Sequence, residues 1–292
     1  MNKLRENMSK NFTKSKKAPL VLKLLLGKKA MARDPSPVVS KLYYVLEQYS
    51  GDEDVQKVHS KVMDVVSNLD VNGAEIYSTK SGMTYYDVKR LLKASTLGKY
   101  GKVLTMIAKY FAPKMVLELG TCIGVSAMYI AGGLEVVNDL KYSLFSVEAS
   151  KSLTDIAKAN LRKFGLDERR CHLINDYFEN VLPGFSSEND LIDFVFLDGS
   201  HTYEATLKYF SWLLDNMRPG GIMMFDDIRW SSGMFRAWKD ICDHKDIAVS
   251  VDLGAIGLCV VKYDHSIDSK KHFSFHVTDV WSILQQLCRQ NE

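Results

Sequence analysis

The chain has 292 residues, 46% hydrophobic and 25% charged, which is typical of globular proteins and sufficient for one large core or two smaller ones. The net charge is +3, but residues 1–34 carry ten Lys or Arg and two acidic residues, which leaves 28 basic and 33 acidic residues elsewhere. This mildly acidic body has no basic stripe, which argues against a nucleic-acid partner. Five widely spaced cysteines without a C-x-x-C pair argue against a zinc site or disulfide framework and favour a cytoplasmic location.

The basic N-terminal tail, residues 1–35, contains the segment KKAPLVLKLLLGKKAMARDPSP. Lys23 interrupts its apolar stretch, which is too short for a bilayer span of about 20 residues. The A-M-A triplet at 30–32 is typical of a signal-peptide cleavage site, but Lys28 and Lys29 lie where the apolar stretch should meet it. Two alternatives stay open: a solvated, flexible extension, or a basic amphipathic segment in peripheral contact with an anionic membrane.

Residues 36–112 are expected to form an all-helical segment that covers the rest of the protein as a preface or lid. Helical spacing of apolar residues predicts helices over Val38–Leu46, Val55–Val66, Tyr86–Ala94 and Gly101–Phe111. The stretch Asn72–Thr84 contains two glycines and many polar residues, which predicts a loop.

From residue 113 to residue 263, strands alternate with helices. Five strands are expected at Met115–Leu119, Ser143–Glu148, Cys171–Asn175, Asp193–Asp198 and Ile222–Asp227, and a strand pair with a tight turn near Gly254 at Ile247–Tyr263. We predict an α/β fold: a doubly wound, mostly parallel seven-stranded sheet with a terminal antiparallel hairpin, preceded by the all-helical N-terminal segment. Residues 264–292 are expected to form a C-terminal extension with a helix at Val280–Leu287.

A glycine-containing turn, VLELGTCIGVS, follows the first strand and places Gly120 and Gly124 four residues apart. Such glycines let the backbone approach a ligand, and the following helix offers free N–H groups. The G-x-G-x-x-G pattern of dinucleotide-binding folds is absent. Glu148 ends the second strand, where an acid can hold a ribose diol.

At this point the chain resembles the class I S-adenosylmethionine-dependent methyltransferases over about residues 100–263. The matching pieces, in order, are VLELGTCIG, FSVEAS, INDYFENVLPGF, FVFLDGSH and MRPGGIMMFDDIRW. The resemblance implies a set of cofactor contacts: Gly120 and Gly124 line the methionine moiety, Glu118 approaches its amino group, Glu148 binds the ribose hydroxyls, and Asp176 lies beside the adenine.

The charges expected around this turn fit a cationic cofactor. Glu118, Glu148 and Asp198 are acidic, and no lysine or arginine lies within the turn. Such a crevice repels a pyrophosphate and suits a sulfonium cation.

Acidic residues also follow two later strands: Asp198 ends the fourth, and Asp226 and Asp227 end the fifth. Neighbouring strands lie about 5 Å apart, so the three carboxylates are expected to converge where ligands bind in open α/β sheets. Like charges oppose folding unless a cation joins them, and oxygen ligands suit Mg²⁺ or Ca²⁺.

This arrangement resembles the metal-dependent O-methyltransferases, both the catechol type and the macrolide-sugar type. The second type places a His three residues after the strand-four Asp, as His201 follows Asp198 here, whereas the Asp226-Asp227 pair departs from both patterns. The resemblance implies that a metal-bound substrate hydroxyl loses its proton to His201 and then attacks the methyl group.

Other interpretations stay open. Asp198 or Ser200 could cap the next helix, Asp226 and Asp227 could fold a turn, and Trp230 could either pack or line an acceptor pocket. A metal-independent N-methyltransferase, a nicotinamide dehydrogenase and a non-enzymatic binding module are the alternative functions; the glycine spacing and the terminal hairpin count against the dehydrogenase. The identity of the small-molecule acceptor and the oligomeric state, a homo-oligomer included, stay open.

Overall fold

The computed structural model describes residues 29–34, 36–69, 91–93, 95–166, 168–185, 191–262 and 271–274, and the backbone of 74–78 and 82–86. The tail up to residue 28 and the helix expected at Val280–Leu287 lie outside the described residues. The elements in chain order are α3 (Pro37–Gln48), α4 (Glu53–Ser67), β1 (Ala74–Ser78), β2 (Gly82–Tyr86), α6 (Lys99–Phe111), β3 (Met115–Leu119), α7 (Val125–Glu135), β4 (Ser143–Val147), α8 (Lys151–Phe164), β5 (Cys171–Ile174), α9 (Phe178–Val181), β6 (Ile192–Leu197), α10 (Tyr203–Asn216), β7 (Met217–Phe225), α11 (Ser232–Asp243), β8 (Ile247–Asp252), β9 (Gly257–Val261) and β10 (Lys271–Ser274).

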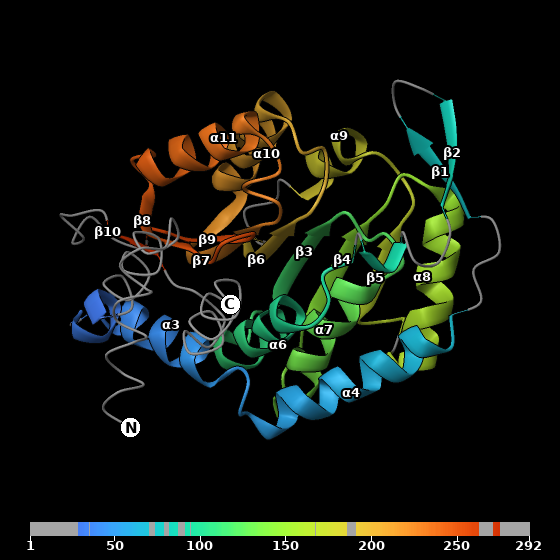
Figure 1. Cartoon of the computed structure of the whole chain (residues 1–292), viewed down its shortest axis with the longest axis horizontal. Coiled ribbons are helices and arrows are strands. Elements are labelled where there is room, and N and C mark those ends of the chain that lie inside the picture. The colour runs from blue at the N-terminus through green and yellow to red at the C-terminus, as the bar shows by residue number, and fades with distance from the viewer. Residues whose placement is uncertain are drawn as a thin grey trace, which may run out of the picture.

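The main sheet has eight strands in the order β10-β8-β9-β7-β6-β3-β4-β5 (Figure 1). The strands from β3 to β7 pair in parallel, and β9 runs antiparallel to both of its neighbours, β7 and β8. The structure confirms the doubly wound, mostly parallel sheet with an antiparallel hairpin. It adds one strand, because β10 pairs in parallel with β8 at the edge of the sheet.

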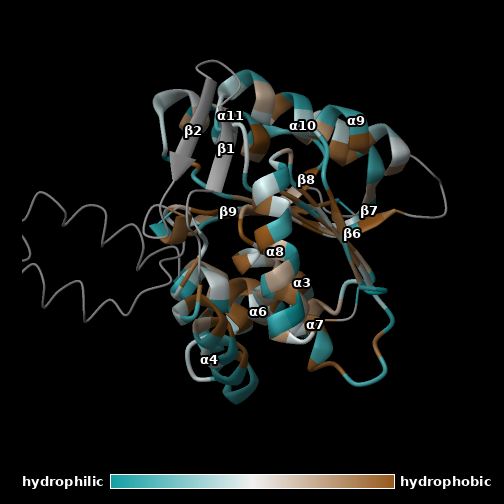
Figure 2. Cartoon of the chain, turned by 90° about the vertical axis from the view of Figure 1, so that its right-hand side faces the viewer, coloured by the Kyte–Doolittle hydropathy of each residue, from teal (hydrophilic) through white to brown (hydrophobic). Residues whose placement is uncertain are grey.

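The central strand β6 shows why the sheet is covered on both faces. Its residues Phe194–Leu197 are all buried, as expected of a parallel strand between two layers. Alternate side chains enter two cores: Phe194 and Phe196 pack with α6 and α7, whereas Val195 and Leu197 pack with α10 and α11. Figure 1 shows these helix pairs on opposite faces, and Figure 2 shows the hydrophobic strands between them.

The N-terminal segment is not entirely helical, which corrects the loop expected at Asn72–Thr84 and the start of the helix expected at Tyr86–Ala94. Residues 91–93 of that expected helix are helical, and residues 87–90 and 94 lie outside the described residues. β1 and β2 form an antiparallel hairpin within the stretch assigned to a loop, and Ala74 pairs with Tyr86, the residue at which a helix was expected to begin. The β2 sequence GMTYY is rich in residues that favour strands. Its partner, β1, leaves no signal in the helical spacing of apolar residues by which this segment was analysed. Helices α3 and α4 form as predicted.

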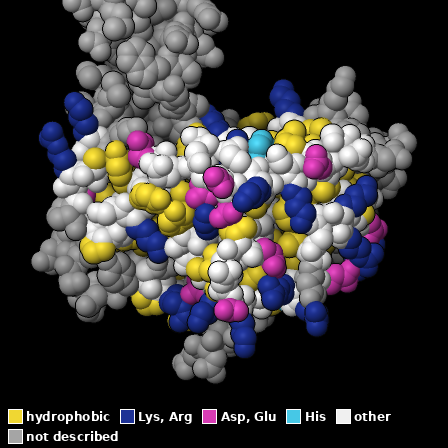
Figure 3. Space-filling view, turned by 90° about the horizontal axis from the view of Figure 1, so that it is seen from below, with side chains coloured by type: hydrophobic (Ala, Val, Ile, Leu, Met, Phe, Trp, Pro, Cys, Tyr) yellow, Lys and Arg dark blue, Asp and Glu magenta, His cyan; other side chains and the backbone are white. Residues whose placement is uncertain are grey.

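Helices α4 and α6 lie on the lower face in Figure 1, where charged side chains of both signs are interspersed in the view from below (Figure 3). The Lys109 ammonium of α6 lies 2.9 Å from Asp52 and 2.7 Å from Asp54, at the start of α4. These ion pairs hold the two helices together. Among the described helices, none has both the length and the apolar character needed to cross a bilayer.

Candidate functional site

The ends of β6 and β7 lie side by side at the carboxyl edge of the sheet. The Asp198 N–H donates to the Leu119 carbonyl at the end of β3, and the Asp226 N–H donates to the Leu197 carbonyl at the end of β6. His201 Nε2 lies 3.6 Å from Asp198 Oδ1 and 3.9 Å from Asp227 Oδ2. The structure therefore brings acids from two strand ends to one imidazole nitrogen.

The helix after β6 is capped by Thr202, whose side-chain oxygen accepts a hydrogen bond from the Ala205 N–H. Neither Asp198 nor Ser200 provides this cap, so the Asp198 carboxylate is left to face His201. Ser200 and Asp227 have φ angles of +50° and +53°, in the left-handed region that non-glycine residues rarely adopt. Backbone strain of this kind concentrates at functional sites, and here it occurs at both strand ends.

The glycine turn packs against the end of β6. Gly120 has φ +110°, and a Cβ atom there would lie 1.9 Å from the Asp198 carbonyl oxygen. Gly124, with φ +82°, is the N-cap residue of α7. The turn, the N-terminus of α7 and the Asp198 backbone therefore meet at one place, and glycine at position 120 makes the close approach feasible.

Glu148, directly after β4, supports this turn from the neighbouring strand. One carboxylate oxygen accepts the Cys122 N–H at 3.0 Å, and the other accepts the Ser150 N–H at 2.9 Å. Burial raises the pKa of Glu148, against the backbone N–H donors that favour its charged form. The carboxylate is thus held beside the glycine turn.

Glu118 is fully buried inside β3, and the Ser146 hydroxyl donates to one of its oxygens. Burial raises the pKa of Glu118 to about 7, the nearby Ser126 and Ser146 hydroxyls oppose this rise, and Glu148 adds to it. Two buried side-chain atoms make no hydrogen bond among the described residues: Glu118 Oε1 and His201 Nδ1. An unsatisfied buried carboxylate oxygen near the glycine turn fits a ligand that brings a hydrogen-bond donor.

Asp176 is half-buried and lies two residues after the end of β5. Its Oδ1 accepts hydrogen bonds from the Tyr177 N–H and the Asn180 side-chain amide, both at 2.7 Å. The neighbouring Asn175 amide donates to the carbonyls of Glu148 and Ala149, which ties this strand end to the end of β4. Asp176 therefore lies at the same edge of the sheet, and the partners of its Oδ1 are Tyr177 and Asn180 rather than Asp198, Asp226 or Asp227.

Asp198, Asp226 and Asp227 form an acidic cluster in which the carboxylates repel one another. Burial raises the pKa of Asp198 well above its usual range, and Asp226 and Asp227 raise it further. Burial raises the pKa of Asp226 to about 6. Burial lowers the pKa of His201, partly offset by Asp227, so the imidazole is neutral at physiological pH. A cationic ligand would relieve the repulsion.

The three aspartates lie close together, but they are not arranged as metal ligands. Among the described residues, no three His, Cys, Asp or Glu side chains are arranged to hold a metal ion. Asp198, Asp226 and Asp227 supply the oxygen chemistry that Mg²⁺ prefers, but both Asp226 oxygens already accept hydrogen bonds, from the Asp227 N–H and the Thr96 hydroxyl. The arrangement of these side chains is therefore not a preformed metal shell.

Two neighbours of the site come from places that spacing alone does not reveal. Thr96 belongs to the N-terminal segment, 130 residues from its partner Asp226. Trp230, with 71% of its surface exposed, places its ring 6.2 Å from the His201 ring. The sequence left Trp230 open between packing and lining an acceptor pocket, and the structure places its exposed ring beside the half-buried His201 imidazole.

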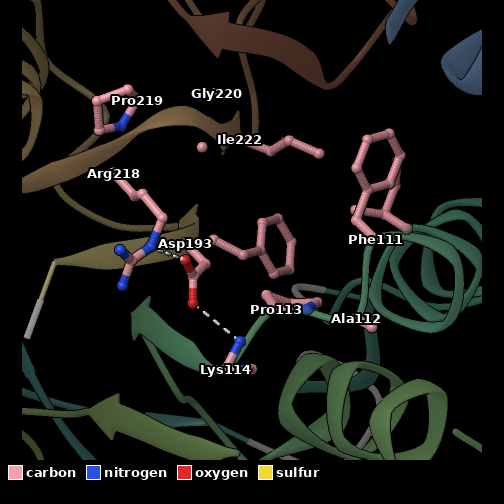
Figure 4. A pocket seen from close by; sticks show the side chains of 12 residues that line it. Phe111, Ala112, Pro113, Lys114, Asp193, Arg218, Pro219, Gly220 and Ile222 are labelled. Atoms are coloured by element: carbon pink, nitrogen blue, oxygen red, sulfur yellow. Dashed lines mark hydrogen bonds and ion pairs between the residues drawn. The ribbon is translucent and has the colours of Figure 1, made fainter. Parts of the chain in front are cut away.

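A separate pocket lies at the opposite, amino-terminal edge of the sheet (Figure 4). Asp193 at its rim accepts hydrogen bonds from the Lys114 and Met115 N–H groups and pairs with Arg218. None of the predicted site residues lines it. Its charged groups stabilise the starts of β3, β6 and β7.

Comparison with known proteins agrees with the geometry. Residues 117–228 match a family described as a methyltransferase domain. A catechol O-methyltransferase from Mycobacterium tuberculosis is 23% identical over 154 residues, 53% of this chain, and one from Niastella koreensis is 26% identical over 129 residues, 44% of this chain. The chain spans 66% and 55% of the length of these curated relatives.

The solved structure of an O-methyltransferase from Bacillus cereus in complex with SAH is 20% identical, with a TM-score of 0.49 over 72% of this chain and 91% of that one. The matched residues 117–228 run from β3, through the glycine turn, to the residues just after Asp227. Over residues 117–228, this chain is therefore similar to a methyltransferase domain.

Proposed function

We propose that this chain transfers the methyl group of S-adenosylmethionine to a hydroxyl of a small-molecule acceptor. The observation that carries the proposal is the convergence of Asp198 and Asp227 on His201 Nε2, at 3.6 and 3.9 Å, beside the glycine turn. A base, several carboxylates and a ligand-binding turn lie at one edge of the sheet. This arrangement suits methyl transfer from a cationic sulfonium donor.

The cofactor assignment uses the residues around the turn. Gly120 and Gly124 hold the methionine moiety, Glu148 the ribose hydroxyls, and Asp176 the adenine side. Glu118 Oε1, buried and without a partner among the described residues, is the acceptor for the cofactor's ammonium group. Pairing with that cation returns Glu118 to its charged form.

The reaction needs one proton acceptor and one in-line displacement. His201 is neutral because burial lowers its pKa, so Nε2 can take the proton of the acceptor hydroxyl. The acceptor oxygen then forms a bond to the methyl carbon while the carbon–sulfur bond breaks, which leaves S-adenosylhomocysteine. Asp198 and Asp227 stabilise the imidazolium that results.

Metal assistance is a separate part of the proposal. The mutual repulsion of Asp198, Asp226 and Asp227 supports a divalent cation such as Mg²⁺ at this edge. Binding of Mg²⁺ would acidify a coordinated hydroxyl.

The test begins with calorimetric titration of the full chain with S-adenosylhomocysteine, followed by turnover of labelled S-adenosylmethionine on a panel of phenols, sugars and polyketides. Each acceptor is assayed as purified, after EDTA, and after Mg²⁺ is restored. Binding together with hydroxyl methylation supports the proposal, and loss with EDTA followed by recovery with Mg²⁺ supports the metal.

Two outcomes contradict parts of it. Absence of S-adenosylhomocysteine binding rules out the methyltransferase. Methylation of amines that is insensitive to EDTA replaces the hydroxyl acceptor by an amine and removes the metal.

A further inference from the structure

The segment before α6 reaches the carboxyl edge of the sheet. Thr96 is buried, with 6% of its surface exposed, and its hydroxyl donates to Asp226 Oδ2 at 3.0 Å. Asp226 directly follows β7, so this hydrogen bond joins the N-terminal segment to the strand end that carries the acidic pair. The two residues are 130 positions apart in the sequence, so only the tertiary fold brings them together.

The Thr96 contact completes the hydrogen bonding of the Asp226 carboxylate. Oδ1 accepts the Asp227 N–H at 2.7 Å, and Oδ2 accepts the Thr96 hydroxyl. An aspartate side chain has two rotatable bonds, and one donor on each oxygen fixes both of them. Asp198 and Asp227 are like charges nearby, so without the second donor repulsion would favour other orientations of Asp226.

We propose that Thr96 is a positioning residue for this site: its hydroxyl fixes the direction of the Asp226 carboxylate and thereby couples the N-terminal segment to the acidic cluster. The inference rests on the proposed function for its effect on turnover, whereas the orientation of Asp226 can be measured without it. Thr96 does not touch the reacting atoms in this assignment; it acts through Asp226.

A second hydroxyl of the N-terminal segment, that of Tyr100 in α6, provides a matched control. Tyr100 donates to the Leu253 carbonyl and accepts the Ala255 N–H, both at 3.1 Å, in the turn between β8 and β9. Tyr100→Phe therefore also removes a hydroxyl that fastens this segment to the edge of the sheet, but it leaves both hydrogen bonds to Asp226 in place.

The experiment compares Thr96→Val, which keeps the shape and removes the hydroxyl, with Thr96→Ser, which keeps the hydroxyl, and with Tyr100→Phe. For each we would measure urea unfolding, S-adenosylhomocysteine affinity, and kcat and KM for the acceptor found by the panel. We expect Thr96→Val to lower kcat/KM about tenfold, as the loss of one hydrogen bond to a charged group allows. Thr96→Ser and Tyr100→Phe should stay within about threefold of the wild type, and cofactor affinity should change little in all three.

Crystal structures of wild type and Thr96→Val, determined under the same conditions, give a readout independent of activity. We expect the Asp226 carboxylate to rotate or to occupy two orientations in Thr96→Val. An unmoved Asp226 in that crystal overturns the proposal, as does a kcat/KM loss in Tyr100→Phe equal to that in Thr96→Val. If the wild type methylates no acceptor, the proposed function fails, and the crystal comparison alone decides the role of Thr96.

Discussion

Gly120→Ala tests whether the glycine turn and the end of β6 are as tightly packed as the structure indicates. The new Cβ would lie 1.9 Å from the Asp198 carbonyl oxygen and 2.8 Å from its carbonyl carbon, whereas such carbon–oxygen contacts normally exceed about 3.3 Å. Asp198 cannot yield easily, because its N–H is bonded to the Leu119 carbonyl at 2.8 Å. The backbone must therefore move by more than about 1 Å.

Two costs add in this variant. Overpacking against backbone costs about 1–3 kcal/mol, and a non-glycine residue at positive φ costs about 1–2 kcal/mol. We expect Gly120→Ala to lose about 2–5 kcal/mol of unfolding free energy in urea and to bind S-adenosylhomocysteine more weakly, because Asp198 is displaced.

Gly124→Ala is the matched control. Its φ of +82° imposes the same kind of backbone cost, but the nearest atom to the new Cβ is the Ala157 Cβ at 3.3 Å. We expect a loss of only about 1–2 kcal/mol. If the two variants lose equal unfolding free energy, the backbone of Gly120 does not approach Asp198 as closely as the structure indicates.

Three further changes test the rest of the site. Because the pKa of Glu118 is raised to about 7 in the fold, its stabilising contribution is complete below pH 4.5 and is lost as the pH rises through 7. Urea unfolding of the wild type should therefore lose roughly 3 kcal/mol relative to Glu118→Gln between pH 4.5 and pH 8, and parallel curves would contradict the burial of a titrating acid. His201→Gln should lower kcat by about 10²–10⁴ with little change in cofactor affinity; an unchanged kcat would mean that another group takes the proton. Trp230→Ala should leave stability within about 0.5 kcal/mol but raise the KM of a ring-containing acceptor roughly 2- to 10-fold, and an unchanged KM would place the acceptor elsewhere.

Some expectations failed where the sequence signal was weak. The hairpin of β1 and β2 lies mainly in the stretch Asn72–Thr84, for which the sequence predicts a loop because its glycines and polar residues carry little periodicity. Its strands depend on each other through pairs such as Ala74 and Tyr86. β10, with the sequence KHFS, has one large apolar residue, and it becomes a strand because the edge of β8 offers it a partner. Neither pairing leaves a local pattern.

The sequence by itself determined the alternation of buried strands and helices, the glycine turn and the acids at the strand ends, since these follow from local periodicity and from residues that directly follow a strand. Only the tertiary structure decided which strand ends are neighbours. The order β7-β6-β3-β4 places Asp226, Asp198, Gly120 and Glu148 along one edge. It also decided that Thr96 binds Asp226 across 130 residues. The physical reason is that side-chain partners at a strand end depend on sheet order and register, which non-local hydrogen bonds and burial determine.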